Sequence, residues 1–87
     1  MKVIYEYPIA QVAGPQGITL PEGDLLHVGL DPTGNICLWI LREKHPAWVN
    51  WVLEVVATGE LTNWEQEHHI GTVVQGSFVW HIFMREA

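Results

Sequence analysis

The chain has 87 residues, of which 48% are hydrophobic, and ten acidic against four basic side chains give it a net charge of −6. This length is enough for one hydrophobic core, and so apolar a composition excludes an intrinsically disordered chain. The negative charge disfavours direct binding to nucleic acid or to an anionic membrane, because both present phosphate groups. We therefore expect one domain over residues 1–87.

Short runs of alternating apolar and polar residues, separated by turn residues, recur about every ten positions, which is typical of antiparallel sheets. The first run, Lys2–Tyr7, ends at Pro8, and a loop then leads to the short segment Ile18–Leu20. Pro21–Asp24 is predicted to be a turn, with its glycine at positive φ. The turn delivers the chain into a strand over Leu25–Leu30.

The clearest hairpin signal is Asp31–Asn35, which combines Asp, Pro and Gly in the order that suits a tight reversal. The next run, Ile36–Arg42, is apolar on both faces, which indicates a strand covered on both sides. Arg42–Pro46 is polar and ends in proline, so we expect a loop. Trp48–Thr58 is compatible with a helix, but its alternation and its β-branched and aromatic residues favour a strand.

The polar segment Glu60–Glu67 contains Thr62–Glu65, a sequence that fits a capping box opening one helical turn. A second hairpin then joins His68–Val74 to Phe78–Met84 through Gln75–Ser77. These elements predict a mostly β fold with about six to seven short strands and at most one short helix. Both a small antiparallel β-barrel and a β-sandwich fit them, and the strand order stays open.

No set of residues has the spacing of a metal or catalytic site. The adjacent His68 and His69 would point to opposite faces of a strand, and no histidine pair has zinc-ligand spacing. Cys37 lies in an apolar run, which indicates a buried small side chain rather than a nucleophile. Gly14–Gly17 lacks the lysine of a phosphate-binding loop. We expect no metal, no cofactor and no enzymatic activity.

The single cysteine excludes an intramolecular disulfide and fits a reducing cytoplasm. The first eight residues include Glu6 and lack the apolar core of a signal peptide. The longest apolar stretches, Ile36–Leu41 and Val52–Ala57, are much shorter than a membrane-spanning helix. We expect a soluble cytoplasmic protein.

Two of the five tryptophans lie at polar loop edges. Trp39, Trp51 and Trp80 fall within strand patterns and are expected in the core, whereas Trp48 and Trp64 have polar or loop neighbours. Tryptophan at a polar rim is enriched among interface anchors, because it buries a large area with few rotatable bonds. The alternative is that each of these two folds back to cap an open end of a barrel.

The distribution of charge suggests a partner. No Lys or Arg occurs between His45 and Met84, although four glutamates lie there. A host protein with a basic surface, such as one that normally binds nucleic acid, would complement this charge. The alternative is that the charge only keeps an apolar protein soluble. The candidate partner-binding residues are Trp48, Trp64, Glu60, Glu65 and Glu67.

Six segments carry a resemblance to a known family: Lys2–Pro8, Ile18–Gly23, Cys37–Trp39, Thr58-Gly59, His69–Thr72 and Phe78–Phe83. In this order they resemble small phage and prophage proteins of unknown function. The closing Gly-Thr and Val-Trp-His-x-Phe motifs are the most specific part, and Arg42–Asn50 departs most. The resemblance implies a virus-encoded gene acting in the bacterial host cytoplasm, and it supplies no catalytic residues.

We therefore expect a binding protein, and three hypotheses follow. The first is an inhibitor that covers a surface of a host protein, as counter-defence proteins such as anti-CRISPRs do. The second is a self-associating module of phage particles or their assembly, favoured by strands that are apolar on both faces. The third is a β-barrel that binds a small molecule. A homodimer is compatible with all three.

Overall fold

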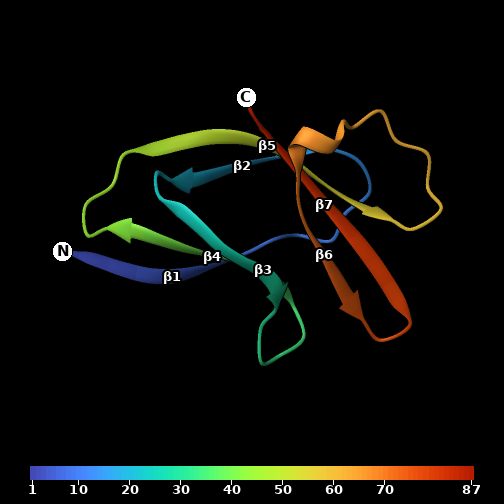
Figure 1. The fold of residues 1–87 in the computed structure, drawn as a ribbon, viewed down its shortest axis with the longest axis horizontal. Coiled ribbons are helices and arrows are strands. Elements are labelled where there is room, and N and C mark those ends of the chain that lie inside the picture. The colour runs from blue at the N-terminus through green and yellow to red at the C-terminus, as the bar shows by residue number, and fades with distance from the viewer.

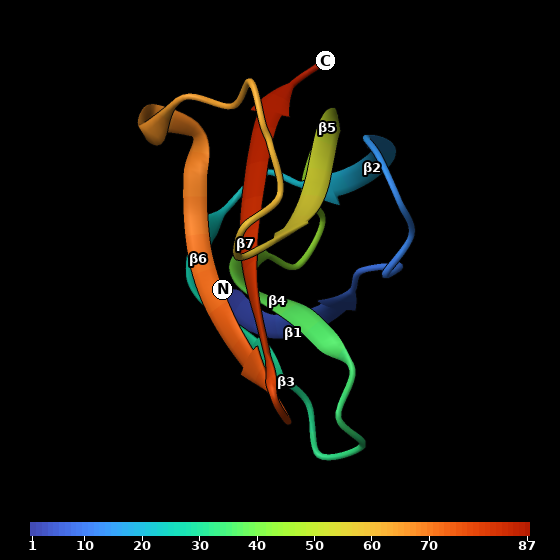
Figure 2. The ribbon, with the colours of Figure 1, turned by 90° about the vertical axis from the view of Figure 1, so that its right-hand side faces the viewer.

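The computed structural model describes all residues 1–87 as seven antiparallel strands in two sheets with one 3₁₀ turn. The elements are β1 Lys2–Pro8, β2 Gln16–Pro21, β3 Asp24–Leu30, β4 Ile36–Glu43, β5 Trp48–Ala57, η1 Gln66–His68, β6 His69–Gln75 and β7 Phe78–Glu86. One sheet has the order β1-β4-β3 and the other β2-β5-β7-β6. The two sheets do not close into a barrel (Figures 1 and 2). The predicted mostly β class is confirmed, and the sandwich is the form adopted.

The core lies between the sheets and comes from alternate residues of their strands. Ile36 and Leu38 of β4 have no exposed surface, and neither have Leu53 of β5 and Ile82 of β7. Period-two alternation places every second side chain of a strand on the inner face, which explains this set. Side chains from both sheets therefore fill the interior of the sandwich.

The outer face of β4 is covered only in part, contrary to the prediction for this strand. Cys37 is buried, but Trp39 and Leu41 are only half-buried. Trp39 lies on the outer face of the three-stranded sheet, 5.5 Å from the ring of His27, so its expected place in the core was wrong. The physical reason is that no third layer covers this sheet. Trp51 and Trp80 do pack against the core.

The predicted turn at Pro21–Asp24 is a corner at which the chain leaves one sheet for the other. Gly23 does not have positive φ there, so that part of the prediction was wrong. A side chain at Gly23 would instead overlap the Leu41 carbonyl oxygen and lie 2.9 Å from Ile40 Cγ2. The corner thus requires glycine for close approach of two backbones. The Glu22 N–H donates to the carbonyl oxygen of Ala47 at 2.8 Å, which ties this corner to the β4–β5 crossover.

The side-chain amide of Gln75 joins separate segments at one end of the sandwich. Its nitrogen donates to the Gly34 carbonyl oxygen at 2.9 Å and to Gln11 Oε1 at 3.0 Å. Its oxygen accepts from Gln11 Nε2 at 2.9 Å and from Trp80 Nε1 at 3.0 Å. A single amide therefore uses its donors and its acceptor to connect the β1–β2 loop, the β3–β4 hairpin and β7.

The capping box predicted at Thr62–Glu65 was wrong, although one short helical turn does form. The Thr62 hydroxyl accepts a hydrogen bond from the Trp64 N–H at 3.1 Å, which makes a local turn. The 3₁₀ turn begins later, at Gln66, and Glu65 before it provides no side-chain cap. No helix in the protein has the length and apolarity needed to cross a membrane.

Strands β3 and β6 pack beside each other where the two sheets meet, and Gly71 is the point of contact. A Cβ atom at Gly71 would lie 2.8 Å from Val28 Cβ, in the buried core. We expect Gly71→Ala to lower the free energy of unfolding by about 1–3 kcal/mol, because β3 and β6 must separate to admit the methyl group. Urea denaturation followed by circular dichroism measures this change.

Gly17→Ala is the matched control, because a Cβ atom at Gly17 on β2 would meet nothing within 4 Å. This control is expected to change the free energy of unfolding by less than about 0.5 kcal/mol. Equal effects of the two substitutions would contradict the close approach of β3 and β6.

Candidate functional site

The connection between β5 and β6 leaves the four-stranded sheet and returns across it (Figures 1 and 2). Trp64 of this connection packs against the outer face of the sheet. The indole stacks on Phe83 of β7, with ring centroids 5.7 Å apart and planes inclined by 20°. Its N–H donates to Glu54 Oε1 at 3.1 Å. Glu54 and Phe83 are direct cross-strand partners, so the indole is held by one apolar and one polar contact at the same level of the sheet.

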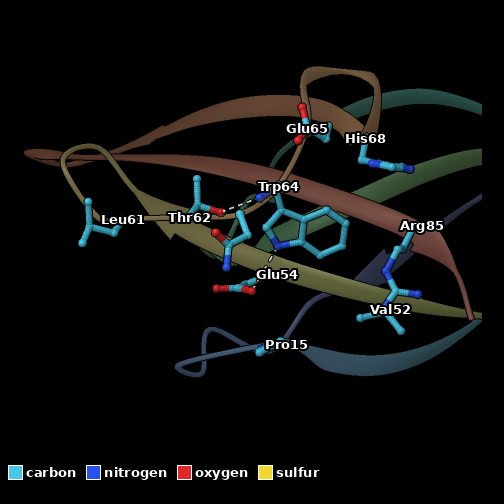
Figure 3. A pocket seen from close by; sticks show the side chains of 10 residues that line it. Pro15, Val52, Glu54, Leu61, Thr62, Trp64, Glu65, His68 and Arg85 are labelled. Carbon is cyan, nitrogen blue, oxygen red and sulfur yellow. Dashed lines mark hydrogen bonds between the residues drawn. The ribbon is translucent and has the colours of Figure 1, made fainter.

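An open groove of about 530 Å³ borders this indole (Figure 3). Its volume falls in the range of ordinary ligand sites. Glu54 and Val52 of β5 form its floor, and Arg85 of β7 lies at one end. Thr62, Asn63 and Glu65 of the connection contribute its polar wall. The groove thus combines one aromatic ring with two carboxylates.

The glutamates of this region are not neutralised within the chain. The one ion pair in the structure joins the amino terminus to Glu43, at 3.6 Å. The Arg85 guanidinium carbon lies 6.0 Å from the Trp64 ring centroid, a cation–π arrangement, and Arg85 pairs with no carboxylate. The groove therefore keeps a negative charge beside a ring face that accepts a cation.

A chain of hydrogen bonds crosses the same outer face beside the groove. His81 Nε2 lies 2.8 Å from the Thr58 hydroxyl and His81 Nδ1 lies 3.1 Å from the Thr72 hydroxyl. The Thr72 hydroxyl in turn lies 3.0 Å from His69 Nε2. Because the Thr58 hydroxyl donates to the Val79 carbonyl oxygen, it accepts from His81 Nε2–H. The His81 ring thus connects the two threonine hydroxyls, and Thr72 continues the chain to His69.

The sequence-predicted candidates do not form one site. Trp64 and Glu65 line the groove, whereas Glu67 lies exposed in η1. Glu60 borders a separate cavity of about 230 Å³, and its carboxylate accepts a hydrogen bond from the Ala57 N–H at 3.0 Å. Trp48 starts β5, is 55% exposed and lies 5.6 Å from the Arg42 guanidinium carbon.

Sequence reasoning missed the contributions of Glu54, Phe83 and Arg85. Glu54 and Phe83 lie within predicted strands, where alternation alone assigns them to a sheet face and nothing more, and Arg85 lies just beyond the predicted end of the last strand at Met84. What brings the three together is the β5–β7 register, which pairs Glu54 with Phe83 and Val52 with Arg85. Strands 5 and 7 are not consecutive in the chain, so no local signal reveals this pairing.

A second cluster lies at the outer face of the other sheet, where Glu6, Asp31 and Cys37 have ligand-type atoms within 4.8 Å of one another. The Asn35 N–H and the Thr33 hydroxyl donate to Asp31 and lower the pKa of its carboxyl. Burial, followed by the charge of Asp31, raises the pKa of the Cys37 thiol to about 11. The thiol therefore keeps its proton at neutral pH, in contrast to an activated nucleophile.

The raised pKa of Cys37 predicts a loss of stability at alkaline pH. An ordinary thiol has a pKa of 9.0, so between that value and about 11 the unfolded chain loses a proton that the folded chain keeps. The free energy of unfolding is expected to fall as pH rises through this window. Urea denaturation at several pH values measures it, and Cys37→Ala should remove this part of the slope.

A substitution at Asp31 separates the effect of its charge on the pKa of Cys37 from the effect of burial. Asp31→Asn should lower the pKa of Cys37 but leave it above 9.0, because the thiol stays buried. Titration of the ultraviolet absorbance of the thiolate measures that pKa directly. A Cys37 pKa of 9.0 or lower in the unsubstituted protein would contradict this environment.

The comparisons with known proteins give one family and no further relative. Residues 1–87 match the family model described as Domain of unknown function (DUF7352). No curated protein and no solved structure matches the chain. The match spans the whole sandwich, including the β5–β6 connection and its groove. The chain therefore belongs to the DUF7352 family.

Proposed function

We propose that this protein is a small binding module that takes a basic segment of a partner protein into the groove beside Trp64, and that it acts by covering that surface of the partner. The observation that carries this proposal is the position of the indole. Glu54 holds the indole against the sheet through a hydrogen bond. The indole also lines an open groove that contains two carboxylates. A held aromatic ring binds at a low entropic cost, since it is already ordered.

The chemistry of the groove favours a guanidinium or ammonium group as its ligand. Arg85 already lies 6.0 Å from the indole centroid, and this contact is an internal example of the contact that a partner's arginine would make. Glu54 and Glu65 add negative charge, and the chain as a whole carries −6. Complementary charge would also speed the encounter with a basic surface.

A partner of this class is a host protein with a basic surface, such as a protein that binds nucleic acid. The resemblance to phage and prophage proteins supports a bacterial host protein, and hence a place in the host cytoplasm and an inhibitory role. A small molecule is the second candidate ligand, and it too would bind in the groove. The space between the sheets is filled by side chains with no exposed surface, such as Leu38 and Leu53.

A short arginine-rich peptide with a fluorescent label tests the groove. Fluorescence polarisation is expected to show binding that weakens with salt, and no binding of a glutamate-rich peptide of equal length. Trp64→Ala should raise the dissociation constant at least about tenfold, because the substitution removes the aromatic anchor of the interface. Trp48→Ala is the matched control, since that ring is exposed outside the groove. An unchanged dissociation constant for Trp64→Ala would contradict the proposal.

Arg85→Gln is expected to strengthen binding of the peptide, whereas Trp64→Ala is expected to weaken it. The substitution at Arg85 removes the internal cation from the indole, and the net charge of the groove becomes more negative by one unit. The same peptide is then expected to bind several-fold more tightly than it binds the unsubstituted protein. Weaker binding of the peptide would contradict the proposal, because it would mean that Arg85 contributes to binding and does not compete with the cation of the peptide.

A further inference from the structure

Strand β1 is the open edge of the three-stranded sheet, and its residues are complementary to a second copy of themselves. β1 pairs with β4 on one side only, and Figure 1 shows it at the left, below β4. Natural sheets protect such edges with bulges, short strands, covering segments, charged side chains or proline. β1 has charged residues and one proline, but no bulge and no covering segment. β3 packs beside β6, β3 and β6 each contain a register shift, and β2 is short and ends in Pro21. β1 has seven residues in unbroken register.

The hydrogen bonds of β1 determine which of its residues face the open edge. The N–H of Ile9 donates to the Ile36 carbonyl oxygen at 2.9 Å, in continuation of the β1–β4 register. Paired residues of an antiparallel ladder exchange both hydrogen bonds at every second position. Val3, Tyr5 and Tyr7 therefore bond to β4. The N–H and C=O groups of Lys2, Ile4 and Glu6 point outward, and Pro8, which has no N–H, occupies the last outward position.

We propose that two copies of the protein associate through antiparallel pairing of β1 about a two-fold axis at Ile4. This register places Lys2 of each copy opposite Glu6 of the other and exchanges about six main-chain hydrogen bonds. A shift of the axis toward the chain start leaves Glu6 unpaired. A shift of the axis toward Pro8 places Glu6 of one copy opposite Ile4 or opposite Glu6 of the other copy. Only the register centred on Ile4 matches both charges and outward hydrogen-bonding groups.

The single copy leaves the charges of this edge without ion-pair partners. Lys2 and Glu6 take part in no ion pair, and the carboxylate of Glu6 lies within 4.8 Å of that of Asp31. Lys2 of the second copy would bring a cation to these two carboxylates. Ile4 is 53% exposed and Tyr5 50% exposed, and both would gain cover, Ile4 from its own counterpart and Tyr5 from Val3 of the second copy.

Charge reversal tests this pairing by sedimentation equilibrium of the whole chain. The unsubstituted protein is expected to dimerise, and Lys2→Glu or Glu6→Lys should each raise the dissociation constant at least about tenfold, because like charges then face each other. A mixture of the two variants should form a mixed dimer, since both contacts become opposite in sign. The double variant should recover the dimer. Lys44→Glu and Glu22→Lys are matched charge reversals at exposed loop positions, and they should leave the dissociation constant of the dimer unchanged.

Amide hydrogen exchange distinguishes edge pairing from association through the outer face of the sheet. The N–H groups of Ile4 and Glu6 should become protected only at concentrations at which the dimer forms, whereas Tyr5 N–H should be protected at all concentrations. The proposal is overturned if the unsubstituted protein stays monomeric up to about 1 mM. It is also overturned if both single reversals dimerise as tightly as the unsubstituted protein, or if Ile4 and Glu6 exchange at the same rate in monomer and dimer.

Discussion

The filled space between the two sheets is the constraint on which every functional possibility of this protein depends. Ile36, Leu38, Leu53 and Ile82 have no exposed surface, and together they occupy the inner faces of β4, β5 and β7. A chain of 87 residues has no material for a second core, so any ligand or partner must bind at an outer face, at a strand edge or at a loop. The groove beside Trp64 and the open edge of β1 are two such places.

The two outer faces differ in what covers them. The four-stranded sheet is covered by its own β5–β6 connection, which places Trp64 on Phe83 and leaves a groove at the side. The three-stranded sheet has no covering segment, and Trp39 on its outer face contacts the ring of His27. The groove holds Glu54 and Glu65 together with Arg85, whereas β1 carries one cation and one anion, Lys2 and Glu6. In the two proposals, the first face binds a basic ligand and the edge of the second sheet pairs with its own copy.

Local features of the fold were predictable from the sequence, and nonlocal ones were not. Alternation located every strand, and Asp31–Asn35 identified its hairpin, because both signals depend on neighbouring residues. Gly23 was expected to be needed for positive φ in a turn, whereas the need for glycine comes from close approach to Leu41, eighteen positions away by residue number. Trp64 was recognised as a candidate, but its partners Glu54 and Phe83 depend on the tertiary pairing of β5 with β7.

The groove and the β1 edge lie on different sheets, and this separation has a consequence for binding. Pairing at β1 covers neither Trp64 nor Arg85, so a dimer would present two open grooves related by the two-fold axis. Basic surfaces of nucleic-acid-binding proteins often repeat their cationic groups along an extended path. Two linked grooves would engage such a surface with an affinity well above that of either groove alone, because the second contact becomes intramolecular. In the proposed dimer, weak binding of one basic side chain in each groove would therefore suffice to hold the proposed partner.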